Sequence, residues 1–141
     1  MNNIHFFKED VRFRFLHQQA LRKWITSTVD GKKNRIEEIN YIFCSDNYLL
    51  ELNKKFLNHH FYTDIITFDN SSEGKKISAD IFISIERVKA NAEKFNTAFN
   101  DELHRVMIHG ILHLLGYKDK TKKDVGEMRR KEDECLEKRN F

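Results

Sequence analysis

Apolar residues recur along this chain with two different spacings, and the alternation between the two predicts its elements. Runs rich in β-branched and aromatic residues predict strands at residues 4–7, 36–44, 64–68 and 77–85. Apolar residues three and four positions apart predict helices at residues 11–28, 45–56, 86–95, 101–115 and 121–138. Because strands and helices interleave, we expect an α+β (α/β mixed) fold, with a small mixed sheet of about four strands and about five helices packed on it.

Length and composition narrow the class of protein further. The chain has 141 residues and no proline, and no repeat or linker interrupts it, so we expect a single domain over residues 1–141. Its 25 basic and 22 acidic residues nearly balance, which suits a partner with phosphates without requiring one. No apolar run is long enough to span a membrane, and the first residues lack a signal-peptide pattern. Cys44 and Cys135 lack metal-binding spacing, so we expect reduced thiols and a cytoplasmic protein.

The predicted helix at residues 101–115 carries the most informative motif of the chain. His109 and His113 are four residues apart, so a helix places both imidazoles on one face. Gly116 then ends the helix, because glycine adopts the left-handed conformation at a helix C-terminus without strain. The chain turns back there and brings Asp119 against the imidazoles. Two histidines and one carboxylate fill three corners of a Zn²⁺ tetrahedron and leave the fourth for water, as in a catalytic site.

Another interpretation of these residues stays open at this point. The histidines would then be buried side chains hydrogen-bonded to their neighbours, with Gly116 an ordinary helix end and Asp119 a turn residue. The apolar residues around them favour a metal, because buried imidazoles need strong partners. Gly110 stands where zinc proteases of the HExxH kind carry a glutamate base, so the pattern disfavours peptidase chemistry by that route.

Three segments of the chain resemble the YbeY family of bacterial metallo-endoribonucleases, the ribosomal-RNA maturation factors. Residues 63–68, Thr-Asp-Ile-Ile-Thr-Phe, are similar to the family's TDVLSF stretch, and residues 80–84 are similar to its GDIxIS strand, with Ala79 where glycine is usual. The family's HGxLHLxGYxx pattern is matched by His109, Gly110, Leu112, His113, Leu114, Gly116 and Tyr117. The resemblance covers about residues 39–136. It implies a zincin-like metal-binding fold, cleavage of single-stranded RNA, and roles in ribosomal-RNA processing and ribosome quality control.

The chain departs from the family pattern at three positions. Asp119 stands where a third histidine is usual, and we interpret this as an exchange of ligands, because a carboxylate also binds zinc and favours harder metals. Leu57 stands where the family usually has an arginine suited to holding a phosphate, so that role is not carried onto Leu57. Residues 58–60 lie nearby and are candidates to replace it. Tyr62 stands where proline is usual, which affects only the rigidity of the loop.

Further candidates are residues that would assist the metal or bind RNA. Asp64 and Asp80 begin or lie within apolar strands, where a carboxylate would orient a ligand histidine, although a strand-end hydrogen bond fits each equally well. Phe61, Tyr62 and Tyr117 are candidates to stack on unpaired bases, with core packing as the alternative, which is slightly favoured for Tyr117. The candidates for contacts with RNA near the metal motif and the preceding loop are Lys54, Lys55, His59, His60, Lys118 and Lys120. A solvated charged face is the alternative for each lysine, and an ordinary loop position is the alternative for the two histidines.

With the resemblance, we expect a zinc-dependent, single-strand-specific endoribonuclease, a hydrolase that acts in 16S rRNA 3′-end processing and ribosome quality control, with the small ribosomal subunit as partner. Zn²⁺ held by His109, His113 and Asp119 would activate a water or an RNA hydroxyl there. Two alternatives stay open. One is a metal-dependent peptidase or amidase on a zincin-like scaffold, which a glutamate reaching the metal water would favour. The other is a ribosome-associated binding module with a structural metal, which a fourth protein ligand would favour.

Overall fold

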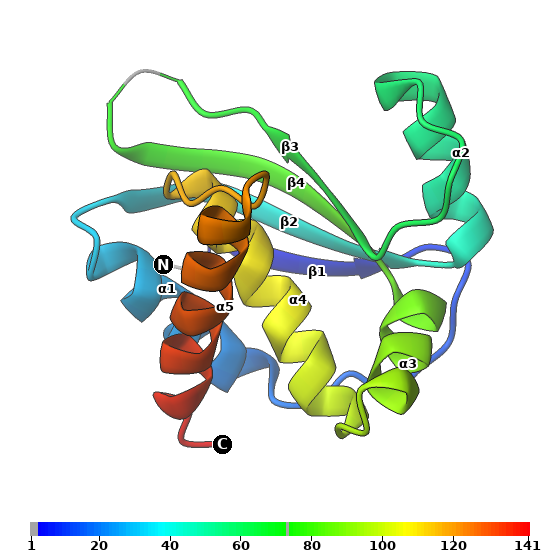
Figure 1. The fold of residues 1–141 in the computed structure, drawn as a ribbon. Helices are drawn as coiled ribbons and strands as arrows, with labels where there is room; N and C mark the ends of the chain where they lie inside the picture. Colours follow the sequence, from blue (N-terminus) through cyan, green and yellow to red (C-terminus); the bar gives the residue numbers. More distant parts are fainter. Residues whose placement is uncertain (1–2, 73) are drawn as a thin grey trace.

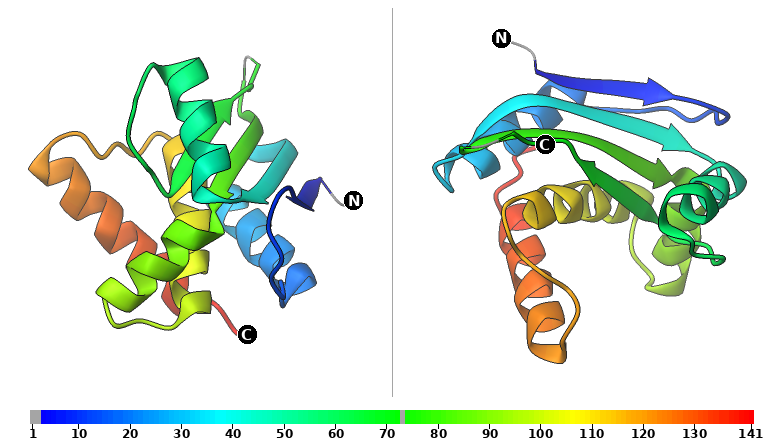
Figure 2. Two further views of the ribbon diagram at one scale, coloured as in Figure 1. Left: turned by 90° about the vertical axis from the view of Figure 1, so that its right-hand side faces the viewer. Right: turned by 90° about the horizontal axis from the view of Figure 1, so that it is seen from above.

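The computed structural model describes residues 3–72 and 74–141 of the chain. Within them it contains five helices and one sheet of four strands, which confirms the predicted α+β class. Figure 1 shows the sheet above most of the helices, and the second helix beyond one end of it. The two further views in Figure 2 show the same arrangement, with the strands side by side and the helices on either side of the layer that they form.

The sheet is mixed because one edge strand runs against the other strands. β1 (Ile4–Lys8), β2 (Arg35–Cys44) and β4 (Lys76–Ser84) run parallel to one another. β3 (Ile65–Asp69) is antiparallel to β4, and the strand order is β1-β2-β4-β3. β1 and β3 are therefore the two edges. All four strands lie within one or two residues of the ranges predicted from the β-branched and aromatic runs.

The helices divide between the two faces of the sheet. α1 (Gln18–Asp30), α3 (Ile85–Lys94), α4 (Phe99–Leu114) and α5 (Lys122–Glu137) share one hydrophobic core with the sheet. α2 (Asp46–Leu57) packs on the other face, against β3 and β4, and forms a smaller apolar cluster there. None of the described helices is both long and apolar enough to cross a membrane.

α4 is the central helix of the larger core. Alternate residues of β2 point toward this core, and Tyr41 and Phe43 among them are fully buried. The Tyr41 hydroxyl donates to the carbonyl oxygen of Met107 on α4 at 2.9 Å, so the helix and the sheet are joined by a buried hydrogen bond as well as by packing. The prediction that the helix carrying the two histidines is buried on most sides is confirmed.

Two helix starts follow from local side-chain chemistry. The Ser45 side chain accepts from the backbone N–H of Tyr48 at the start of α2. At the start of α5, Thr121 and Asp124 each accept from the other's backbone N–H and form the capping box that their spacing predicts. Both contacts are within four residues in the chain, which is why the sequence alone reveals them.

The first helix begins seven residues later than the apolar spacing predicts, so the prediction of a helix from residue 11 is wrong. Phe13 and Phe15 both pack on the ring of Phe43, with ring centroids 5.3 and 4.8 Å away. Residues two apart share a face in an extended chain but not in a helix. His17, with a φ of 63°, then turns the chain into α1. Tertiary contacts of the aromatic rings have overridden the helical spacing here.

His104 on α4 is a buried histidine outside the predicted metal motif. It is 4% exposed, and its ring packs against those of Trp24 and Phe141, which also contact each other. The Arg139 guanidinium donates to its Nδ1 at 2.7 Å. Burial, together with the charge of Arg139, lowers the pKa of His104 to about 4, so the imidazole stays neutral in the folded protein.

We expect His104 to make the folded protein less stable in mild acid. Between the ordinary pKa of histidine, 6.5, and the folded value of about 4, the unfolded chain binds a proton that the folded chain does not, so stability falls as pH falls through this range. The loss from pH 7 to pH 5 is about 2 kcal/mol from this residue. Urea unfolding of the metal-free protein at both pH values measures it.

His104→Asn removes this titration. From pH 7 to pH 5, the unfolding free energy of this variant should therefore fall by about 2 kcal/mol less than that of the wild type. Equal pH dependence in wild type and His104→Asn would contradict the prediction.

Candidate metal centre

The two histidines of the motif lie on α4, one turn apart, with their ring centroids separated by 4.6 Å. The helix ends immediately after them, where the N–H of Gly116 donates to His113 O and the N–H of Tyr117 donates to Leu112 O. Gly116 has a φ of 104°, the left-handed conformation that the sequence predicts for it. This turn directs the following loop back across the end of the helix.

The returning loop brings Asp119 to both imidazoles. Its Oδ2 lies 3.1 Å from Nε2 of His113 and 3.4 Å from Nε2 of His109. One ligand atom from each of the three residues lies within 4.8 Å of the other two. Among the described residues, this group of three is the one that the geometry brings together for a metal ion.

The hydrogen bond that Nδ1 of each ring makes determines that Nε2 of the same ring carries the lone pair. Nδ1 of His109 donates to Oε2 of Glu132 at 2.6 Å, and Nδ1 of His113 donates to the carbonyl oxygen of Tyr117 at 3.0 Å. Since both partners are acceptors, each Nδ1 carries the ring proton, and each Nε2 of a neutral ring presents a lone pair to Asp119. Three electron-pair donors that face one another fit a cation between them, so this donor set suits a divalent metal.

Glu132 is a functional residue that the sequence reasoning missed. It lies on α5, its side chain is 7% exposed, and it accepts from Arg105 at 2.9 Å as well as from His109. The spacing of Met128, Glu132 and Cys135, four and then three residues apart, places all three on the buried face of α5. A carboxylate on the apolar stripe of an otherwise charged helix was the signal that would have identified it.

The pKa values of His109 and Asp64 are both raised, for different physical reasons. Burial lowers the pKa of His109, but the hydrogen bond and charge of Glu132, with the charges of Asp119 and Asp64, outweigh burial and raise it overall. Burial raises the pKa of Asp64, and the nearby His109 opposes that effect only in part. The carboxylates thus surround the first ligand histidine from three segments of the chain.

Asp64 and Asp80, both predicted to orient a ligand histidine, lie on different sides of the sheet. Asp64 precedes β3 and lines the same groove as the three ligands, but Glu132 occupies the position on Nδ1 of His109. Asp80 faces away from α4 and accepts from Asn40 and Asn70, at 3.0 and 3.3 Å. The structure therefore corrects the prediction for Asp80, because successive strand residues point to opposite faces and its neighbours Ala79 and Ile81 are the ones facing the core.

A groove of about 660 Å³ runs from the three candidate ligands, His109, His113 and Asp119, along β3 to the loop after α2. Asp64, Asp69 and Asp119 contribute carboxylates to its lining, and no lysine or arginine lines it among the described residues. The complete lining is Asn53, Leu57, His59, Phe61, Thr63, Asp64, Ile65, Ile66, Thr67, Asp69, His109, His113, Leu114 and Asp119. The groove itself is therefore poor in positive charge.

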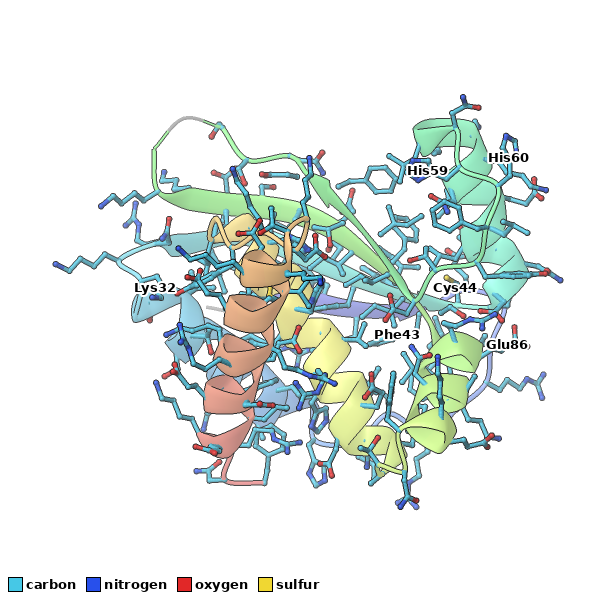
Figure 3. The ribbon with its side chains drawn as sticks, in the orientation of Figure 1. Lys32, Phe43, Cys44, His59, His60 and Glu86 are labelled. Carbon is cyan, nitrogen blue, oxygen red and sulfur yellow. The ribbon has the colours of Figure 1, made fainter. Side chains whose placement is uncertain are left out.

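Of the residues predicted to contact RNA, only His59 lines this groove. Its ring stacks on that of Phe61 with centroids 5.1 Å apart, and Asn53 holds this loop by donating to Phe61 O at 2.9 Å. Figure 3 shows His59 and the neighbouring His60 beside the far end of α2. His60 does not line the groove.

The predicted lysine contacts lie outside the groove. Lys54 forms an ion pair with Glu51 at 3.5 Å, and Lys55 lies over the ring of Phe56. Lys118 and Lys120 are exposed on the loop that carries Asp119, and neither lines the groove. The sequence places these side chains near the motif, but it does not show on which side of an element they lie.

Gly110, between the two ligand histidines, faces the sheet. A Cβ at this position would lie 3.1 Å from Cδ1 of Ile65 and 3.2 Å from Oγ1 of Thr67. A glutamate there, as in the HExxH motif, would require the side chains of Ile65 and Thr67 to shift by a few tenths of an ångström. The one glutamate that touches a ligand histidine, Glu132, lies behind the ring on Nδ1, on the side away from the lone pairs.

Together, the fold and this site define a small α+β protein with a candidate metal centre of two histidines and a carboxylate at one end of an open groove. Comparison with known proteins identifies the family. A family model described as "Endoribonuclease YbeY" matches residues 3–140, and the chain belongs to that family. The resemblance inferred from the three sequence segments is thereby confirmed.

Curated relatives match over nearly the whole chain. A protein of Cytophaga hutchinsonii named Endoribonuclease YbeY is 54% identical over 138 residues, which cover 98% of this chain and 96% of that relative. Proteins of the same name from Flavobacterium psychrophilum and Porphyromonas gingivalis are 49% and 45% identical and cover 92% and 96% of this chain, and 92% and 89% of their own lengths. A solution structure of a Thermotoga maritima protein is similar with a TM-score of 0.65 and 28% identity, covering 95% of this chain and 87% of that one.

We expect Glu132→Gln to weaken metal binding by roughly tenfold to a hundredfold. The amide keeps the size of the side chain, but its single oxygen cannot accept from both His109 and Arg105, and it removes the charge that makes the imidazole of His109 a stronger ligand. Asp133→Asn is the matched control, because Asp133 also pairs with Arg105, at 2.6 Å, yet does not touch His109. Zn²⁺ titration against a competing chelating dye measures both variants. Equal affinities for Glu132→Gln and Asp133→Asn would contradict the role of Glu132.

Proposed function

We propose that residues 1–141 form a single metal-dependent hydrolase domain that acts as a single-strand-specific endoribonuclease in the cytoplasm. The observation that carries the proposal is the convergence of two Nε2 atoms and one carboxylate oxygen, in a groove, in a chain of the YbeY endoribonuclease family. We further propose that its substrate is ribosomal RNA, with 16S rRNA 3′-end processing and ribosome quality control as its roles and the small ribosomal subunit as its partner. The names of the relatives support the RNA-cleaving activity.

His109, His113 and Asp119 are the residues that would hold the metal, and we propose Zn²⁺. A divalent cation at this position supplies a Lewis acid for a phosphoryl oxygen and lowers the pKa of water to near neutrality. The chain's own contribution is to keep the protons on the two Nδ1 atoms, through Glu132 and Tyr117 O, so that both Nε2 lone pairs stay available. Asp119 adds a negative charge that a third histidine would not add.

The aromatic rings beside the centre support RNA as the substrate class, while the charge of the groove assigns the phosphate to the metal. Because the groove is lined by carboxylates and lacks lysine and arginine among the described residues, a phosphodiester in it depends on the metal for charge neutralisation. His59 and Phe61 present stacked rings at the groove, and Phe61 is 57% exposed. Exposed rings stack on bases that have no pairing partner, which favours a single strand over a duplex.

The two alternative functions fit the geometry less well. A peptidase of the HExxH kind needs a glutamate on the lone-pair side of the histidines, whereas Gly110 has no side chain and Glu132 lies behind His109. A structural metal in a binding module needs a fourth protein ligand, whereas the described residues bring three together. An open coordination position supports an enzyme.

We expect the purified protein to bind about one zinc ion per chain and His113→Ala and Asp119→Ala to lose it. Cleavage of a single-stranded RNA should fall at least about a hundredfold in both variants, since losing a ligand costs more than losing a partner behind it. Asp69→Ala, which removes another groove carboxylate, should keep the metal. Elemental analysis and gel-based cleavage on the same samples make the measurement.

Cleavage by the metal-depleted protein, or retention of metal by both ligand variants, would refute the proposed centre. Duplex RNA of the same sequence should be cleaved much more slowly, and equal rates would refute the single-strand preference. A precursor of the 16S rRNA 3′ end, free and within small ribosomal subunits, tests the proposed substrate. No cleavage of that precursor in either form, beside cleavage of other single strands, would refute the ribosomal role alone.

A further inference from the structure

A second pocket, of about 610 Å³, lies between α1 and α5 and reaches Leu112 of α4 at its base. It shares no lining residue with the metal groove. Its volume is in the range of small-ligand sites. The lining residues are Ala20, Lys23, Trp24, Ser27, Thr28, Gly31, Lys32, Leu112, Lys131, Cys135, Lys138, Asn140 and Phe141.

The charged side chains of this pocket are of one sign, since four lysines and no aspartate or glutamate line it among the described residues. Lys131 forms an ion pair with Glu134 at 2.9 Å. Lys23, Lys32 and Lys138 form no ion pair within the described part of the chain, although Lys32 lies over an aromatic ring. A concave surface that gathers positive charge from separate segments attracts anions more strongly than isolated surface lysines do.

The other lining residues suit the sugar and phosphate of a nucleotide. Ser27 and Thr28 bring hydroxyl groups, and Asn140 brings an amide. The aromatic wall is held firmly, because Trp24 Nε1 donates to Cys135 O at 2.8 Å and the ring of Phe141 packs edge-on against Trp24. The pocket is thus built from two helices joined by a buried hydrogen bond.

The pocket is linked to the metal centre through one residue. Lys32 Nζ lies 5.3 Å from the centre of the Tyr117 ring, and the carbonyl oxygen of Tyr117 accepts from Nδ1 of the ligand His113. Figure 3 shows Lys32 beside α5, on the opposite side of the molecule from His59 and His60. Tyr117 therefore lies between the candidate metal centre and Lys32, which lines the pocket.

We infer that this lysine-lined pocket binds backbone phosphates of the RNA strand whose reacting bond lies in the metal groove. The two concavities differ in charge. Among the described residues, the groove is lined by aspartates and by no lysine or arginine, whereas the pocket is lined by lysines and by no aspartate or glutamate. The inference rests on RNA as the substrate of the proposed function. The pocket holds the strand through charge and does not require a metal.

The test is binding of a fluorescent single-stranded RNA to metal-free protein, followed by anisotropy over a series of salt concentrations. The triple variant Lys23→Gln, Lys32→Gln, Lys138→Gln should bind about tenfold more weakly at low salt. The slope of log affinity against log salt should become shallower by about 2, since each contact with a single strand contributes about 0.7. The control triple Lys75→Gln, Lys76→Gln, Lys89→Gln removes the same charge from exposed positions outside the pocket and should keep the wild-type slope.

Several outcomes overturn the inference. One is an equal loss of affinity in both triple variants, which would show a general effect of charge. A second is an RNA affinity of the pocket triple variant equal to that of the wild type. A third is a lack of RNA binding by the metal-free wild type at low salt. Binding of adenosine monophosphate in the pocket with unchanged RNA affinity in the triple would assign the pocket to free nucleotides instead. Thermal melting confirms that each variant is folded.

The same samples separate this inference from the proposed nuclease activity. If metal-loaded protein cleaves RNA but the pocket triple binds and cleaves as the wild type does, the inference fails and the nuclease proposal stands. If no metal restores cleavage but RNA binding depends on Lys23, Lys32 and Lys138, the pocket is real and the nuclease proposal fails.

Discussion

The close packing of α4 against β3 and β4 is the contact on which both the core and the candidate metal centre depend. Gly110 makes it possible, since an added Cβ would lie 3.1 to 3.4 Å from side chains of both strands. His109 and His113 flank this contact on the same helix, so the approach of helix to sheet brings the imidazoles beside the edge strand where the groove opens. A bulkier residue would push the helix outward, and the distance from the histidines to Asp64 would change with it.

The packing of α5 against α4 places Glu132 beside the candidate metal centre, on the Nδ1 side of His109. Glu132 on α5 accepts from His109 and from Arg105, so a buried carboxylate is balanced by two partners on α4. Such a carboxylate would be costly if either partner were missing. The same helix contributes Lys131 to the pocket that it forms with α1, and Lys138 follows directly after its end. α5 therefore links the proposed metal chemistry in one concavity to the positive charge in the other.

Much of the fold was predictable because its signals are local. The four strands and most of the helices follow from apolar spacing, and the starts of α2 and α5 follow from Ser45 and Thr121. The stretch before α1 was mistaken for helix because Phe13 is at helical spacing, yet its partner is Phe43, about thirty residues away. Asp80 was placed correctly on a strand, but which face it occupies depends on the packing of the whole sheet.

The sequence alone determined the set of candidate metal ligands. The four-residue spacing of His109 and His113, and a glycine that turns the chain toward Asp119, are properties of about ten consecutive residues. Only the tertiary structure decided that Glu132 stands behind His109 and which lysines gather in a pocket. Those arrangements depend on contacts between helices far apart in the chain, and the spacing of residues within one helix does not specify which other helix its face will meet.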